Sequence, residues 1–264
     1  MPLQLDVVAL GAPEVDIARR FYTTAFSPAV TDDGDSAALD LHGTGQVALS
    51  VTECLATAAG TTPATSGFRG YVLTYTVNQP TEVKSVMEVA ARGGAEVLKP
   101  AKKALFGSFS GAFQAPDGAI WKVAAATGKD TGPAAAVPLP TETTLILGVT
   151  APKASKTFYE AVGMTVDRDY GSKYVDFHPA KAAIRLCLME RGVLARDAGA
   201  AKDGDGFPAI VLNCAAQSRD EVDALLAAAT AAGGRITAAA AGTPEGGYGG
   251  HFTDPDGFSW KVTH

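Results

Sequence analysis

The sequence has fewer basic than acidic residues and no long apolar run. Its 264 residues include 22 Lys and Arg against 28 Asp and Glu, which gives a net charge of −6. Proteins that bind nucleic acid usually have a basic surface, so we expect no nucleic-acid partner. The apolar runs stay below the roughly 18 residues that a membrane span needs, so we expect no membrane partner.

Cysteine is also scarce, and several catalytic motifs are missing. Cys54, Cys187 and Cys214 are odd in number and have no paired spacing, which indicates small buried residues in a reducing compartment. The N-terminus has no basic segment followed by an apolar one, so we expect a cytoplasmic protein. Abundant Ala and Gly with sparse Lys is typical of a GC-rich bacterial genome. The sequence contains neither a Gly-x-Ser-x-Gly nucleophile motif nor a glycine-rich loop between a strand and a helix.

What the sequence does contain is a repeated hairpin. Residues 249–262, GGHFTDPDGFSWKV, place two apolar runs around Asp-Pro-Asp-Gly. Proline, aspartate and glycine suit successive positions of a tight turn, so the stretch predicts a β-hairpin. A similar stretch, SGAFQAPDGAIWKV, occupies residues 110–123, which lie 139 positions earlier. Two such stretches indicate a duplication.

Other pairs of motifs recur in the same order. The pairs are Leu10-Gly11 with Leu147-Gly148, Phe21-Tyr22 with Phe158-Tyr159, Asp40-Leu41-His42 with Asp176-Phe177-His178, Glu82-Val83 with Glu221-Val222, and Gly93-Gly94 with Gly233-Gly234. Their separations, from 136 to 140 positions, differ only as loop insertions would make them differ. We therefore predict two domains, at residues 1–126 and 142–264, joined by a Gly-, Pro- and Ala-rich linker at 127–141.

Within each half, the pattern strand–helix–strands occurs twice. Helices are expected from Val15 to Phe26, from Pro80 to Gly93, over 154–162, and after Ser218, where Ser-Arg-Asp-Glu is a capping box. Segments 56–66 and 193–206 are predicted to be loops. Strands are predicted at 3–10, 37–41, 47–51, 70–77, 95–98, 107–113, 120–124, 144–149, 173–177, 184–189 and 209–215.

With these motifs the chain resembles the glyoxalase/bleomycin-resistance/extradiol-dioxygenase superfamily, also called the vicinal oxygen chelate superfamily. The resemblance covers both halves and implies an α+β fold with two tandem domains. Each domain would be a pair of βαβββ modules that form a curved mixed sheet around a cleft. In the family, the cleft holds a divalent metal or a small ligand.

The resemblance also implies metal ligands at defined positions. Here those positions hold Val7, Val72, Lys122, Thr144, Lys261, and either Val211 or Ile210. Valine has no donor atom, and a protonated lysine has no free lone pair. We therefore expect no metal and no cofactor.

Six residues are expected to bind a ligand: Lys122, Lys261, Tyr248, His251, His42 and His178. The two lysines either bind an anionic or carbonyl-bearing ligand, or are strand lysines that reach solvent. His42 and His178 either line a cleft mouth or are edge and turn residues. The positions that match Tyr248 and His251 in the other copy hold Phe109 and Ala112. This difference predicts two unequal clefts.

Three functions remain open. The first is a metal-independent protein that binds or sequesters a small molecule such as a natural product or an antibiotic, as a monomer or a homodimer. The second is a metal-free lyase, isomerase or cyclase of bacterial specialised metabolism that uses Lys, His or Tyr as acid and base. The third is an inert duplicated scaffold.

Trp121 and Trp260 are adjacent in sequence to Lys122 and Lys261, so strand alternation points them to the opposite face. Both tryptophans are therefore expected in the core.

Overall fold

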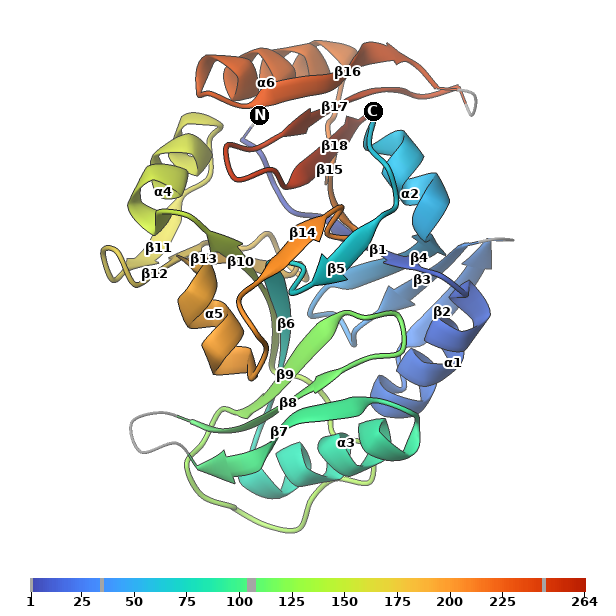
Figure 1. The fold of residues 1–264 in the computed structure, drawn as a ribbon, viewed down its shortest axis with the longest axis vertical. Helices are drawn as coiled ribbons and strands as arrows, with labels where there is room; N and C mark the ends of the chain where they lie inside the picture. The colour runs from blue at the N-terminus through green and yellow to red at the C-terminus, as the bar shows by residue number, and fades with distance from the viewer. Residues whose placement is uncertain (1, 34–35, 104–107, 244–245) are drawn as a thin grey trace.

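The computed structural model describes residues 2–33, 36–103, 108–243 and 246–264. These residues form an α+β fold built on two eight-stranded mixed sheets with helices packed against them (Figure 1). The predicted fold class is confirmed. Gly107, the predicted first residue of one strand, lies outside the described residues.

The first sheet, here called the terminal sheet, combines the two ends of the chain. Its strands are β1 (Val7–Ala12), β2 (Ala29–Asp33), β3 (Ser36–Asp40), β4 (Gln46–Val51), β15 (Ile210–Ala215), β16 (Arg235–Gly242), β17 (Tyr248–Thr253) and β18 (Ser259–Thr263). They lie in the order β16-β17-β18-β15-β1-β4-β3-β2. The two ends of the chain meet where β1 pairs with β15 in antiparallel orientation, with Val7 opposite Asn213.

The second sheet, here called the central sheet, uses the middle of the chain. Its strands are β6 (Tyr71–Val77), β7 (Glu96–Lys103), β8 (Phe109–Gln114), β9 (Ile120–Ala125), β10 (Glu142–Val149), β11 (Val166–Asp169), β12 (Tyr174–Phe177) and β13 (Arg185–Glu190). They lie in the order β11-β12-β13-β10-β6-β9-β8-β7. The antiparallel pair β6 and β10 joins the two halves of the chain, with Thr74 opposite Thr144.

Each module therefore shares its sheet with a module from the other half of the chain. The sequence predicts instead that the two consecutive modules of one half share a sheet. The path of segment 127–141 explains the difference, because this segment returns the chain to β6. The amide of Ala126 donates to Val77 O at 2.7 Å, and the amide of Thr141 donates to Thr76 O at 2.7 Å. β10 consequently continues the sheet beside β6.

The two modules of one half meet through their helices instead. These helices are α1 (Val15–Phe26), α3 (Pro80–Arg92), α4 (Pro152–Ala161) and α6 (Arg219–Ala231). α1 packs against α3, and α4 packs against α6. The side chains that α1 buries recur at the three- and four-residue spacing of one helix face: Ala18, Phe21, Tyr22, Ala25 and Phe26. The helices and the sheet faces beneath them form one large core.

The repeated Phe-Tyr motif links this helix layer to the repeated hairpin. In the first half, the Tyr22 hydroxyl donates to Asp117 Oδ2 at 2.7 Å, and Trp121 Nε1 donates to Tyr22 Oη at 3.1 Å. The second half repeats the chain of bonds, at 2.6 and 3.4 Å, with Tyr159, Asp254 and Trp260. Both tryptophans are fully buried, as the strand alternation predicts.

The predicted capping box at the start of α6 is present. Ser218 Oγ accepts a hydrogen bond from the Glu221 amide at 3.3 Å, and the Glu221 carboxylate accepts one from the Gln217 amide at 2.7 Å.

Two short helices occupy the sheet faces that point away from this core. α2 (Thr52–Ala58) follows β4, and α5 (Arg191–Ala198) follows β13. The prediction of loops at 56–66 and 193–206 was therefore wrong in part, since both segments overlap these helices. Helices of seven or eight residues depend on tertiary contacts rather than on intrinsic propensity, and Leu55 and Leu194 provide such contacts.

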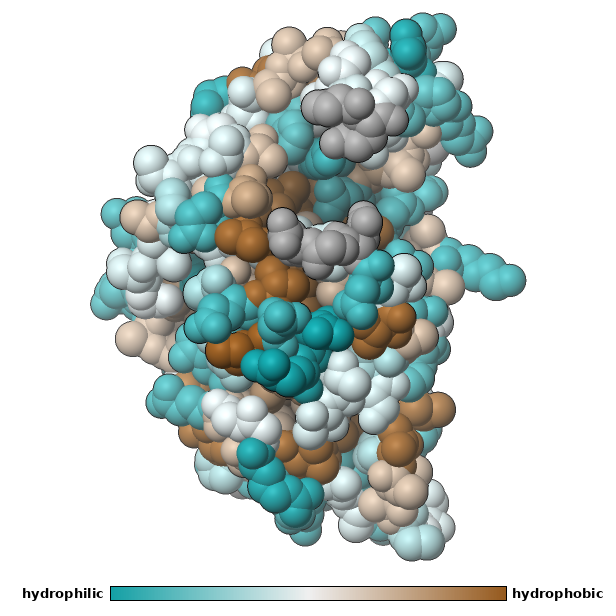
Figure 2. Space-filling model, turned by 90° about the vertical axis from the view of Figure 1, so that its right-hand side faces the viewer, coloured by the Kyte–Doolittle hydropathy of each residue, from teal (hydrophilic) through white to brown (hydrophobic). Residues whose placement is uncertain are grey.

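A two-stranded ribbon, whose strands each follow one of the short helices in the sequence, lies in the middle of Figure 1. It pairs β5 (Thr65–Gly67) with β14 (Gly204–Gly206) in antiparallel orientation. On the face shown in Figure 2, hydrophobic residues gather in patches in the middle part and are interrupted by hydrophilic ones. The helices in the described part of the chain are too short or too polar to cross a membrane.

Candidate functional site

A cavity of about 380 Å³ lies on the terminal sheet, on the face that α2 covers; we call it the terminal cleft. Strands β1, β4, β15, β17 and β18 contribute to it together with α2. Its lining residues are Val7, Ala9, Ala48, Ser50, Cys54, Leu55, Ala58, Val211, Asn213, His251 and Lys261. Most of this lining is apolar, and the polar groups come mainly from three neighbouring strands. Such a combination is typical of a small-molecule site.

The register of these three strands brings the polar residues together. On β18, Lys261 lies beside Asn213 of β15 and opposite His251 of β17. The Asn213 amide nitrogen donates to Val7 O at 3.2 Å, which holds this side chain toward β1. Because Trp260 points into the core, strand alternation directs Lys261 to the opposite face. Within the described residues, Lys261 Nζ has neither a hydrogen-bond nor an ion-pair partner.

His251 is the second polar group of interest in the terminal cleft. Its Nδ1 is buried and has no hydrogen-bond partner among the described residues. Burial, followed by the charge of Lys261, lowers the pKa of His251 to about 4. The imidazole is therefore neutral at neutral pH, so it can accept or donate a hydrogen bond there.

The donor atoms at the family's metal positions do not fit a metal site. At the level of Lys261, the neighbouring strands present Val7 and Asn213, and only the asparagine has an oxygen donor. Val211 lines the cleft whereas Ile210 belongs to the core. Of these two alternatives, Val211 is therefore the better match to the family's metal-ligand position on β15. In the part of the chain that the structure describes, His, Cys, Asp and Glu form no group of three that could hold a metal.

The corresponding face of the central sheet, here called the central cleft, is filled by α5. Leu194, Ala195 and Ala198 of this helix pack against Val72, Ile146 and other strand residues. Lys122, the counterpart of Lys261, forms an ion pair with Asp197, with Nζ and Oδ2 2.7 Å apart. The space that remains beside Lys122 is about 90 Å³.

The other three predicted site residues lie outside both clefts. His42 has a left-handed backbone (φ 55°), and its Nε2 is 2.8 Å from Phe26 O at the end of α1. The His178 side chain is 59% exposed, and its Nε2 is 3.8 Å from Asp167 Oδ1. Both positions match the alternative of edge and turn residues.

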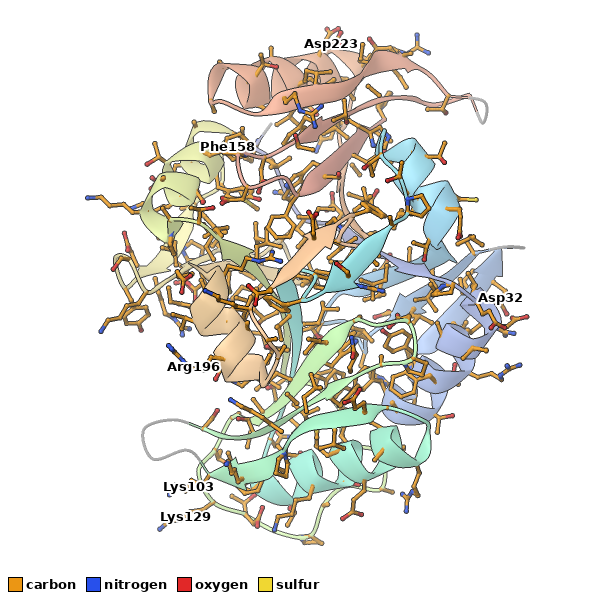
Figure 3. The ribbon with its side chains drawn as sticks, in the orientation of Figure 1. Asp32, Lys103, Lys129, Phe158, Arg196 and Asp223 are labelled. Carbon is orange, nitrogen blue, oxygen red and sulfur yellow. The ribbon has the colours of Figure 1, made fainter. Side chains whose placement is uncertain are left out.

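Tyr248 lies on the face of β17 that α6 covers. Its hydroxyl donates to Asp223 Oδ1 at 3.0 Å, and the guanidinium of Arg219 lies over its ring. Figure 3 shows Asp223 at the outer edge of the molecule, on α6. The pairing of Tyr248 with His251 in one site was therefore wrong, because the strand directs them to opposite faces. Of the six predicted residues, the structure brings together only Lys261 and His251.

Sequence reasoning missed the contribution of α2. Cys54, Leu55 and Ala58 line the terminal cleft from α2; of these residues only Ala58 lies in the predicted loop 56–66, and no structure was predicted for the other two. A signal for this helix was available in the sequence, because Leu55 and Leu194 are separated by the same 139 positions as the repeated hairpins. Asn213 was also missed, because the family resemblance points to Val211 or Ile210 on that strand.

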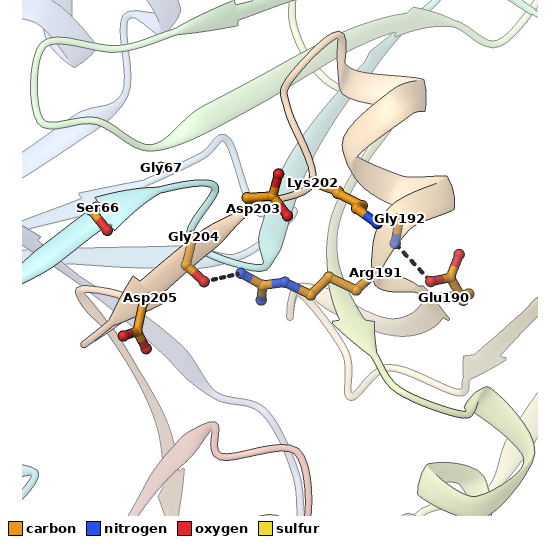
Figure 4. A pocket seen from close by; sticks show the side chains of 9 residues that line it. All are labelled: Ser66, Gly67, Glu190, Arg191, Gly192, Lys202, Asp203, Gly204 and Asp205. Carbon is orange, nitrogen blue, oxygen red and sulfur yellow. Dashed lines mark hydrogen bonds between the residues drawn. The ribbon is translucent and has the colours of Figure 1, made fainter.

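A larger open pocket of about 610 Å³ lies beside the β5–β14 ribbon (Figure 4). Its most prominent cation is Arg191. The guanidinium of this residue donates to Phe68 O at 2.6 Å and to Gly204 O at 3.2 Å, so it ties α5 to the ribbon. The Glu190 carboxylate is likewise used by the amides of Gly192 and Val193. These groups serve the fold, and the terminal cleft is the better candidate site.

Comparison with known proteins agrees with this architecture. Residues 143–262 match the Glyoxalase/Bleomycin resistance protein/Dioxygenase superfamily. Glyoxalase I from Zea mays has a similar structure, with a TM-score of 0.65 and 18% identity over 98% of this chain and 92% of that one. A putative dioxygenase from Bacillus subtilis subsp. subtilis str. 168 has a TM-score of 0.61 and 12% identity over 99% of this chain and 85% of that one. No curated protein matches the chain.

At these identities the solved structures show a common fold only. The fold over the whole chain and the family match over residues 143–262 make the protein a two-domain member of the glyoxalase fold class. The superfamily matched by residues 143–262 is the vicinal oxygen chelate superfamily that the sequence resembles.

Proposed function

We propose that the protein binds a small molecule in the terminal cleft without using a metal ion. The observation that carries this proposal is a lysine ammonium without a protein partner among the described residues, set in a mostly apolar cavity of about 380 Å³. Apolar walls contribute affinity through buried area, and a few polar groups fix the orientation of the ligand. Lys261, His251 and Asn213 are those groups.

The expected ligand is a partly apolar compound with an anionic or carbonyl group, and a natural product or an antibiotic fits this description. The chain can supply the site alone, because both sheets are completed within one copy. A monomer is therefore sufficient for binding, although a homodimer is compatible with it. Sequestration requires binding but no chemical step, so a site with one cation and apolar walls is sufficient for it.

Native mass spectrometry of the protein purified from its host tests this proposal. We expect a retained organic compound that is released on denaturation, and binding that survives treatment with a chelator. Ala9→Ile is the matched variant, because the counterpart of Ala9 in the filled central cleft is Ile146. This variant should lose the compound while it remains folded. Near-stoichiometric Zn, Fe, Ni or Mn whose removal abolishes binding would contradict metal independence.

A second candidate function is supported by His251. Its Nδ1 is buried without a partner among the described residues, and its lowered pKa keeps the ring neutral. A neutral imidazole beside a lysine can act as a general base in a metal-free lyase, isomerase or cyclase. Comparing the mass of the compound before and after incubation with the protein separates the two functions. Conversion that His251→Gln stops without weakening binding would favour the enzyme.

A further inference from the structure

The two clefts are related by the duplication, and matching positions can be compared directly. Lys122 and Lys261 are 139 positions apart, and so are Leu55 and Leu194. Both leucines are buried on the short helix that covers their cleft. The same separation relates Ala58 on α2 to Asp197 on α5.

In the central cleft, the protein supplies its own anion to the lysine. Asp197 Oδ2 lies 2.7 Å from Lys122 Nζ. Lys99 holds the end of α5 in place, since its Nζ donates to the carbonyl oxygens of Arg196 and Asp197 at 2.6 and 2.7 Å. An internal carboxylate on a fixed helix thus neutralises the lysine of this cleft.

In the terminal cleft, the residue that matches Asp197 is Ala58, whose side chain is a methyl group. Ala58 lines the cavity together with Lys261, and among the described residues no acceptor lies within hydrogen-bonding distance of Lys261 Nζ. The space beside the two residues is part of a cavity of about 380 Å³, compared with about 90 Å³ beside Lys122. The duplication has therefore kept the cation in both clefts and the internal anion in only one.

We infer that the ligand of the terminal cleft carries a carboxylate that pairs with Lys261 in the position that the Asp197 carboxylate occupies beside Lys122. This inference rests on the proposed function, because it assigns the chemical class of the ligand in the same cavity. The remainder of the ligand is apolar, since it lies against Val7, Leu55 and Val211. His251, which also lines the cleft, can hydrogen-bond to a second polar atom of the ligand.

The test uses two probes of nearly equal shape, 2-naphthoate and its neutral amide 2-naphthamide. Their dissociation constants are measured by fluorescence titration or calorimetry on the full chain. A charge-assisted hydrogen bond should make wild-type protein bind the carboxylate about 10- to 100-fold more tightly than the amide. Ala58→Asp should place an internal carboxylate next to Lys261 and abolish this preference. Ala58→Asn, which has nearly the same volume but no charge, should retain most of it.

The outcomes separate the inference from the proposed function. If both probes bind equally well and Ala9→Ile blocks both, the cleft is a binding site but its ligand need not be a carboxylate, and the inference is overturned alone. If neither probe binds in a saturable way up to millimolar concentration, the inference and the proposed function are both overturned. A preference for naphthoate that persists in Ala58→Asp, with thermal melting showing a folded variant, would place the carboxylate elsewhere and overturn the inference.

Discussion

The terminal and central clefts start from the same repeated module and end as an open and a filled site. The difference lies first in the size of the strand side chains. Where the central sheet has Ile146 and Cys187, the terminal sheet has Ala9 and Ala48 at the matching positions. The larger pair belongs to a packed cluster with α5, whereas the two alanines pack in a cluster with α2 and also line a cavity. A duplicated fold can thus keep one copy as a scaffold while the other remains available for a ligand.

The covering helices differ in the same direction. Glu190 caps α5 by accepting hydrogen bonds from the amides of Gly192 and Val193, both at 2.8 Å. The matching residue before α2 is Val51, which has no side-chain acceptor. A capped N-terminus stabilises a helix by about 1 kcal/mol, so α5 has a source of stability that α2 lacks. The helix without a side-chain cap covers the open cleft.

The largest expected effect compares the leucines beneath the two helices. Leu194 is 1% exposed in a packed cluster, so Leu194→Ala should lower the free energy of unfolding by about 2–5 kcal/mol. Leu55 is 8% exposed and borders an existing cavity, so Leu55→Ala should cost less, about 1–2 kcal/mol. Urea unfolding of both variants measures the difference. Equal losses would mean that the two helices are packed alike, contrary to the comparison.

The next effect concerns ligand affinity. Lys261→Met removes one charge-assisted hydrogen bond and should weaken binding by about 1.5–3 kcal/mol, or roughly 10- to 150-fold. Lys122→Met is the matched control, because Lys122 is paired with Asp197 and should leave affinity unchanged. Thermal melts should show little change for the Lys261 variant, since methionine keeps most of the apolar stem. Affinity that is unaffected by Lys261→Met would return this residue to the role of a strand lysine reaching solvent.

The modules and the orientation of Lys261 could be predicted from the sequence, whereas the pairing of the modules could not. The hairpin motif around Trp260 and the Phe-Tyr pair located the modules, because turn residues and helix periodicity are local signals. Strand alternation also placed Lys261 opposite Trp260. The choice of module partners could not be predicted, because β10 reaches β6 through the path of residues 127–141, which has no periodic pattern.

Local sequence patterns also could not predict which cleft is filled by its short helix and which stays open. Short helices such as α2 and α5 are stabilised by the surfaces that they cover, so their sequences alone do not distinguish them from loops. The repeat does align Ala58 with Asp197, but its meaning appears only when Asp197 is seen beside Lys122. The glycine-rich strand around Tyr248 has irregular register with β16, which local alternation does not reveal.

The third prediction concerns the pH dependence of stability. The folded-state pKa of His251 is about 4, below its ordinary value of 6.5, so the unfolded state binds more protons between these pH values. His251 therefore contributes stability above about pH 6.5 that is lost as pH falls toward 4. Because the ring is partly exposed, we discount this contribution to about 1 kcal/mol. The matching residue in the central cleft is Ala112, which cannot titrate.

The measurement is the difference between wild type and His251→Gln in unfolding free energy at several pH values. The difference is needed because burial raises the pKa of Asp254 to about 7, and the stability from that group is lost as pH rises through the same range. Subtraction cancels Asp254 and isolates His251. A difference that does not vary between pH 4 and 7 would show that the imidazole is not desolvated in the cleft.

The smallest expected effect is the strength of the Lys122–Asp197 ion pair itself. The two side chains are 21% and 41% exposed, so water screens their attraction and a coupling of only about 0.2–1 kcal/mol is expected. A double-mutant cycle with Lys122→Met and Asp197→Asn, read out by urea unfolding, measures this coupling. Such a small value would mean that apolar packing under α5 closes the central cleft and that the ion pair only neutralises the lysine. A coupling above about 2 kcal/mol would instead make Asp197 the main reason that this cleft is closed. In that case, Ala58→Asp alone should be enough to draw α2 firmly onto the terminal sheet.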